Sequence, residues 1–273
     1  MTYATLVNSV ISLAGDGSHF PRTEVLCEQW LLRLALRWYS DPNCELRDDP
    51  QRPATSSLHF RECETWFSEA MPRTPFRPRT GVQFRETATH LDGVIGEIKR
   101  SGASKAGFRL KKSAARLVVI EAKVTAAIGP KPEHAPPNVG DDYDQVSRLT
   151  ISALWELWKA TEGRPPGDRN ADAHLDVLLI APKESCHQSV REFRERRADE
   201  QRLRVSRSLA AWAEYRALAP NWLEYANNCL ENRTHFLAPS WEDIAGEIAA
   251  AREKDGEAFR TLLKEVYSAY RGR

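Results

Sequence analysis

Residues 117–124 read LVVIEAKV, an apolar run that only Glu121 and Lys123 interrupt. A short apolar run of this kind predicts a buried β-strand. Side chains at positions i and i+2 of a strand point to the same face, so Glu121 and Lys123 should stand side by side. Burying charged groups among apolar side chains costs free energy unless a partner or a ligand compensates them. The run therefore predicts a further charged group nearby.

A suitable group lies upstream in residues 90–95, which read HLDGVI and place Asp92 near the start of a second short apolar strand. If the two strands pair as a hairpin, Asp92 and Glu121 converge on one divalent cation beside the ammonium group of Lys123. Two carboxylates, a hard cation and an amine make up a hydrolytic site for phosphodiesters. In such a site Lys123 would orient or deprotonate the attacking water. The alternative is a surface ion pair between Glu121 and Lys123, with Asp92 as an unrelated strand residue.

Asp92, followed on the next strand by Glu121-Ala122-Lys123, resembles the signature of the PD-(D/E)XK nuclease superfamily, which has the restriction-endonuclease-like fold. Leu91 stands where the superfamily usually has a proline. The resemblance implies a Mg²⁺ ion bound by Asp92, Glu121 and a backbone carbonyl near Ala122, with Mn²⁺ able to substitute.

Two further positions resemble the superfamily, and the resemblance covers roughly residues 22–182. Glu24 lies in the first turn of a helix expected to begin at Thr23, where many members carry a glutamate near the metal, so Glu24 is a further candidate catalytic residue and metal ligand. Glu28, one turn on, competes with it, and the helix dipole alone favours a glutamate in a first turn. Gln145 lies on the helix after the catalytic strand, where many members carry a glutamine. The resemblance implies that it holds the catalytic water or contacts a phosphate; the alternative is a solvent-facing helical residue.

The remaining pattern predicts an α/β fold with a mixed central β-sheet flanked by helices, which the resemblance specifies as a restriction-endonuclease-like core. Strands are expected at residues 82–89, 91–97, within 109–124 and at 175–181. Helices are expected at residues 23–40, at 59–71, and from a cap at Asp141 or Asp142 to Ala160. The order strand, strand, strand, helix, strand implies a mixed sheet with a crossover helix.

After residue 183 the pattern turns helical, with helices expected at 189–218, 220–230 and 241–270. We therefore expect a nuclease-like α/β core at residues 1–183 and a helical extension at residues 184–273 that packs on it. The position of this boundary is approximate, because no linker of distinctive composition marks it.

The composition is that of a globular chain, with 273 residues, of which 41% are hydrophobic and 28% charged. No apolar run approaches the roughly 20 residues of a membrane-spanning helix. Residues 1–15 carry no basic residue ahead of their apolar ones, so no signal peptide is expected. The five cysteines are odd in number and form no C-x-x-C pair, which favours reduced thiols and a cytoplasmic location.

Basic residues gather around Asp92, although the formal net charge is only +1. Residues 73–116 contain eleven Lys or Arg against three acidic residues. The candidates for nucleic-acid binding lie on the segment that joins the two catalytic strands; they are Lys99, Arg100, Lys105, Arg109, Lys111 and Lys112. We expect this segment to lie beside the metal site and, together with Arg116, to follow a phosphate backbone. The alternative is an ordinary solvated hairpin.

Taken together, these patterns predict a Mg²⁺-dependent nuclease, with DNA favoured over RNA as the substrate and an endonuclease as the expected type. The resemblance implies a role in restriction or antiviral defence. The alternative is a catalytically silent nucleic-acid-binding or scaffolding subunit that retains the fold. The C-terminal helices are the expected interface with a second copy of the chain or with a partner subunit.

Overall fold

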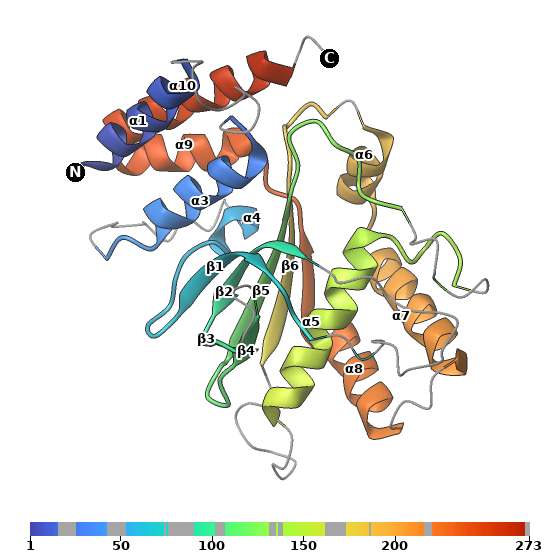
Figure 1. Ribbon diagram of the computed structural model, residues 1–273. Helices are drawn as coiled ribbons and strands as arrows, with labels where there is room; N and C mark the ends of the chain where they lie inside the picture. The colour runs from blue at the N-terminus through green and yellow to red at the C-terminus, as the bar shows by residue number, and fades with distance from the viewer. Residues whose placement is uncertain are drawn as a thin grey trace.

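The computed structural model describes residues 1–15, 26–42, 53–73, 75, 90–101, 107–130, 135, 139–161, 173–185, 187–215 and 220–270. Its centre is a five-stranded sheet in the order β1-β2-β5-β6-β7 (Figure 1). The strands are β1 (Thr65–Ala70), β2 (Leu91–Gly96), β5 (Arg116–Ala122), β6 (His174–Ile180) and β7 (Thr234–Leu237). β1, β2 and β5 pair antiparallel, whereas β5, β6 and β7 pair parallel. The predicted α/β class with a mixed central sheet is confirmed.

Helices cover both faces of this sheet (Figure 1). On one face, Leu117 and Val119 of β5 join a core with α5 (Gln145–Thr161), α7 (Ala198–Tyr215) and α8 (Pro220–Arg233). On the other face, Val118 and Ile120 join a core with α1 (Tyr3–Gly15), α3 (Glu28–Tyr39), α9 (Trp241–Ala251) and α10 (Glu253–Tyr270). Every residue of β5 is buried, which explains why the strand is a continuous apolar run rather than an alternating one.

The crossover from β5 to β6 runs through α5, as the order of strands and helices predicted. Two parallel neighbours need such a long connection because the chain must return to the starting end of the sheet. Between β2 and β5 the chain forms a separate two-stranded hairpin, β3 (Ile98–Arg100) with β4 (Phe108–Leu110). The short helix α4 (Pro53–Ser56) precedes β1.

Three predictions of local structure are wrong. The helix expected at residues 59–71 is instead β1, because pairing with β2 at Trp66↔Ile95 and Phe67↔Val94 determines the structure there. α3 begins at Glu28 after Cys27, whose backbone is extended, and not at Thr23. α5 begins at Gln145. The carboxylate that caps its first turn is that of Asp144, whose Oδ1 accepts a 2.9 Å hydrogen bond from the backbone N–H of Ser147, and not that of Asp141 or Asp142.

The C-terminal region contains the expected helices, namely α6 (Gln188–Glu195), α7, α8, α9 and α10. It also supplies β7, which the sequence pattern did not indicate and which pairs with β6. The sheet thus contains strands from both sides of residue 183, and the boundary proposed there stays a prediction. The strand expected at residues 82–89 lies outside the described residues. Of the helices that the structure describes, none is both long and apolar enough to span a membrane.

Candidate active site

The antiparallel pairing of β2 with β5 brings Asp92 next to Glu121. The register runs to Gly93↔Ile120, so Asp92 and Glu121 are the next residues on the two strands. Asp92 Oδ2 accepts a hydrogen bond of 2.8 Å from the backbone N–H of Ala122. The N–H and C=O of one strand residue point the same way, so the Ala122 carbonyl also faces the edge on which Asp92 lies. Two carboxylates and one carbonyl therefore meet at the end of these strands.

Glu121 is almost completely enclosed, with 1% of its surface exposed. Its Oε1 accepts a 2.6 Å hydrogen bond from Gln145 Nε2 and forms an ion pair with Lys123 Nζ. Its Oε2 is buried and has no hydrogen-bond partner among the described residues. A buried acceptor without a donor is costly, and in native proteins it points to a missing ligand, water or ion.

The pKa values of both carboxylates are raised, chiefly by burial. Burial is the largest cause that raises the pKa of Glu121 to about 8, and the negative charge of Asp92 adds to it, whereas Lys123 opposes the shift. Burial also raises the pKa of Asp92, against the Ala122 N–H and the charge of Lys123, which lower it. A divalent cation placed between the two carboxylates would remove both the repulsion and the need for a proton.

The backbone of Lys123 is held on both sides by hydrogen bonds. Its N–H donates to the Ile180 carbonyl of β6 at 2.7 Å, and its own carbonyl accepts from the indole N–H of Trp241 at 2.8 Å. Trp241 is fully buried at the start of α9. The ammonium group is thus carried by a residue, just after the end of β5, whose backbone is fixed by β6 and by α9.

Gln145 reaches the site because the start of α5 is bonded to the loop that follows β5. Its backbone N–H donates to the Gly129 carbonyl at 2.8 Å, and its Oε1 accepts from the Gly129 N–H at 2.9 Å. A Cβ atom at Gly129 would lie 3.0 Å from Gln145 Oε1, so this approach favours glycine. The structure therefore places Gln145 on Glu121 itself, and not in solvent.

Of the two glutamates that compete for a further site role, Glu28 is the one the structure describes. It is the first residue of α3, and its charge contributes to the raised pKa of Asp92, so it lies near the carboxylate pair. Glu24 lies outside the described residues. Arg148, which the sequence did not single out, lies one turn beyond Gln145, and its Nε is buried without a partner among the described residues.

The basic hairpin does not lie where the sequence predicted it. Asp92 is the second residue of β2, and the chain runs from it to Gly96 before entering β3, so the hairpin lies about 13 Å or more from Asp92 at the other end of the strands. An antiparallel connection joins the end of β2 to the beginning of β5, whereas the carboxylates stand at the beginning of β2 and the end of β5. The prediction that the hairpin lies beside the metal site is therefore wrong.

The basic residues themselves fall into three groups. Lys99, Arg100, Lys111 and Lys112 are exposed, and Lys105 lies outside the described residues. Arg109 is half-buried, with NH1 3.9 Å from the Glu156 carboxylate. Arg116 is buried and forms a 2.7 Å ion pair with Glu64, so it is not available to a phosphate backbone.

The donor set suits a metal that keeps part of its water shell. Within the described part of the chain, no three His, Cys, Asp or Glu side chains gather as a metal-binding cluster. Asp92, Glu121 and the Ala122 carbonyl would supply three oxygen donors, and Mg²⁺ commonly binds through one or two carboxylates while retaining several waters. The residues present thus fit Mg²⁺ and would not fit zinc, which prefers nitrogen and sulfur ligands.

Comparison with known proteins adds no identification, since no family model, no curated protein and no solved structure matches the chain.

Proposed function

We propose that this protein is a Mg²⁺-dependent nuclease with a restriction-endonuclease-like core, acting on DNA. The observation that carries the proposal is the convergence of Asp92 and Glu121 at the end of two paired strands, with Lys123 bound to one of them. The buried, partnerless Oε2 of Glu121 and the raised pKa of both carboxylates support a cation there. The role in restriction or antiviral defence that the resemblance implies belongs to the same proposal.

Each residue has a distinct role in this mechanism. Asp92, Glu121 and the Ala122 carbonyl would hold the metal, and Gln145 fixes the Glu121 carboxylate through Oε1. A bound Mg²⁺ supplies the neutralisation of charge on the phosphoryl oxygens. Lys123 Nζ, next to Glu121, would orient the attacking water.

Cleavage of a supercoiled plasmid tests the proposal. We expect nicking or linearisation with Mg²⁺ or Mn²⁺ and none with EDTA. Each of the substitutions Asp92→Asn, Glu121→Gln and Lys123→Met should lower the cleavage rate by at least about 100-fold, because the loss of any one member of a catalytic unit removes most of its rate enhancement. Asp199→Asn, which changes an exposed carboxylate at the start of α7, is the matched control and should cleave normally.

Two measurements separate a nuclease from a silent binding subunit. Glu121→Gln protein should still bind duplex DNA while losing Mn²⁺ binding in isothermal titration calorimetry. A crystal grown with Mn²⁺ should show anomalous density between Asp92 and Glu121. If Glu121→Gln cleaved the plasmid with Mg²⁺ at the wild-type rate, the mechanism would be overturned. If the wild-type protein bound duplex DNA but neither bound metal nor cleaved, the scaffolding alternative would be favoured.

A further inference from the structure

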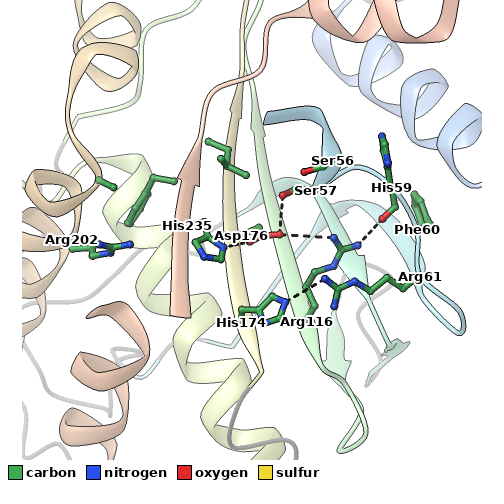
Figure 2. Close-up of a pocket in the computed structure, with 13 residues that line it drawn as sticks. Ser56, Ser57, His59, Phe60, Arg61, Arg116, His174, Asp176, Arg202 and His235 are labelled. Carbon is green, nitrogen blue, oxygen red and sulfur yellow. Dashed lines mark hydrogen bonds and ion pairs between the residues drawn. The ribbon is translucent and has the colours of Figure 1, made fainter. Parts of the chain in front are cut away.

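A cavity of about 700 Å³ lies at the end of the sheet opposite to the carboxylate pair (Figure 2). Arg116 and His174, the first residues of β5 and β6, line it, and Arg116 is about 16 Å along β5 from Glu121. Arg116 shares one face of β5 with Val118 and Ile120, and Glu121 shares the other face with Leu117 and Val119, so the Arg116 side of the cavity and the carboxylates lie on opposite faces of the sheet. The cavity is therefore separate from the candidate active site.

A buried carboxylate organises the centre of this cavity. Asp176 is 5% exposed, and its Oδ2 accepts from the Ser57 hydroxyl at 2.9 Å. Its Oδ1 lies 2.9 Å from Nδ1 of His235, and Arg116 NH1 is 3.9 Å from Oδ2 (Figure 2). With Nδ1 of His235 directed at the carboxylate, Nε2 of its ring is left for a ligand, and more than half of this side chain is exposed.

Two arginines give the cavity an excess of positive charge. Neither Arg61 nor Arg202 forms an ion pair with a carboxylate of the described residues, whereas Arg116 is paired with Glu64. Arg61 is exposed and its NH2 lies 3.4 Å from His174 Nε2. Arg202 donates to the Thr234 carbonyl, and its Nε is buried with no partner in the described part of the chain. Burial first, and then the charge of Arg61, lower the pKa of His174, whereas the Asp176 carboxylate raises it.

The rest of the lining is apolar and partly aromatic. Phe60 from the segment before β1, Phe236 and Leu237 of β7, and Ala198 of α7 form these walls. Cavities of roughly 300–1,000 Å³ with apolar walls and a few convergent polar groups are typical of small-molecule sites. Arginine is the side chain best suited to phosphate, and aromatic rings stack on nucleobases.

We propose that this cavity binds a nucleoside phosphate, with Arg61, Arg202 and His235 on the phosphate and Phe60 against the base. This site goes beyond the proposed nuclease activity and does not depend on it. The Asp176 carboxylate is already occupied by Ser57, His235 and Arg116, so it orients the phosphate-binding histidine and does not repel the ligand.

Isothermal titration of the full chain in EDTA tests this proposal with three probes: adenosine 5′-monophosphate, adenosine and inorganic phosphate. We expect the nucleotide to bind more tightly than adenosine, and inorganic phosphate to compete with it. Arg61→Ala and Arg202→Ala should each weaken nucleotide binding by about tenfold or more, the usual effect of losing a charge-assisted hydrogen bond, and should leave adenosine binding little changed.

The matched control is Arg197→Ala, which removes an exposed arginine just before α7 that is paired with Asp199. It should bind the nucleotide as the wild type does. Arg61 is exposed, so its replacement leaves the fold intact, and a thermal unfolding curve checks this for both arginine variants. Glu121→Gln should also bind normally, which keeps this test independent of the nuclease site.

Several outcomes would overturn the proposal. They are the absence of nucleotide binding at millimolar concentration, equal affinity in Arg61→Ala, Arg202→Ala and wild-type protein, and loss of binding in Glu121→Gln. Binding of a 5′-phosphorylated oligonucleotide without binding of the mononucleotide would instead assign the cavity to the end of a nucleic-acid strand.

Discussion

Glu121 is the residue at which folding and the proposed chemistry oppose each other. The strand must bury it to complete the sheet, yet burial and the charge of Asp92 disfavour its ionised form. One lysine and one glutamine bind Oε1, and Oε2 is left without a donor among the described residues. In the metal-free protein the carboxylate is therefore a source of instability that either a proton or a cation relieves.

This conflict predicts that the metal-free protein loses stability as the pH rises from about 4.5 to about 8. Glu121 is protonated in both the folded and the unfolded chain below this window. Within it the unfolded chain releases the proton while the folded chain keeps it, so the free energy of unfolding falls with pH, by at most about 1.4 kcal/mol per pH unit for one proton. Urea denaturation in EDTA across this window measures the effect. Because Asp92 is coupled to Glu121, the transition belongs to the pair.

The variant Glu121→Gln should flatten this pH dependence, and Mg²⁺ should raise wild-type stability at pH 8 but not that of the variant. Glu257→Gln, which alters an exposed glutamate of α10, is the control and should keep the wild-type slope. A wild-type protein whose stability rises between pH 5 and 8 would contradict the assignment of a raised pKa to this pair.

Glu121, Lys123 and Asp92 are predictable from the sequence because their signal is local, whereas Gln145 is indicated only by the resemblance. A charge inside an apolar strand is visible in LVVIEAKV, and Asp92 follows from the same logic. The choice between Glu24 and Glu28 was left open by the sequence, because the position of Glu28 near Asp92 depends on the packing of α3. Asp176, inside the apolar run of β6, carries the same local signal as Glu121, and it lines the cavity at the opposite end of the sheet.

Among the elements, those with buried apolar runs or helical periodicity were predictable, and those formed by pairing were not. β5, β6, α5, α9 and α10 follow from the pattern of their own residues. β1 is only partly buried, and its adjacent Trp66 and Phe67 suit a helix as well as a strand. Only its pairing with β2 makes this segment a strand. The position of the basic hairpin follows from chain direction, since β2 leads away from Asp92.

The close crossing of α9 and α10 makes one glycine indispensable. A Cβ atom at Gly256 would lie 2.3 Å from the Cα and Cβ atoms of Ala249, whereas a Cβ at Gly246 meets no atom of the described residues within 4 Å. Gly256→Ala should therefore destabilise the protein by about 1–3 kcal/mol or more through overpacking. Gly246→Ala, in the middle of α9, should stabilise it by about 0.5–1 kcal/mol because alanine favours helix. Urea denaturation of the two variants measures the change in the free energy of unfolding that each substitution causes, and equal changes would refute the close crossing.

The corrected position of the β3–β4 hairpin changes what its charges should do. Lys99, Arg100, Lys111 and Lys112 are exposed but remote from the carboxylates, so they can contact only a duplex that extends beyond the site. Replacing all four by alanine in a Glu121→Gln background should lower the log–log salt slope of duplex binding by about 0.9 for each phosphate that the variant no longer neutralises. The control removes exposed cations of α10, namely Lys254, Arg260 and Lys264. An unchanged slope would leave the hairpin an ordinary solvated one.

At the scale of the whole molecule, the C-terminal region completes both the sheet and the site. β7 covers the edge of β6, and α9 and α10 bury Val118 and Ile120 from the second face. Trp241 of α9 donates to the carbonyl of Lys123, so a candidate catalytic residue is held by a helix more than a hundred positions away. Helix α1 packs on α10, which ties the two ends of the described chain together (Figure 1).

This arrangement predicts that residues 1–183 do not fold alone. Without the C-terminal region, β6 presents an unpaired edge and the second core loses two of its four helices, which leaves too little buried apolar surface to offset chain entropy. The full chain should show one cooperative transition in urea, and the 1–183 fragment should show none and should bind a hydrophobic dye such as ANS. If instead the fragment unfolds cooperatively, residue 183 marks a true domain boundary, and the helices after it are an extension that the core can lose.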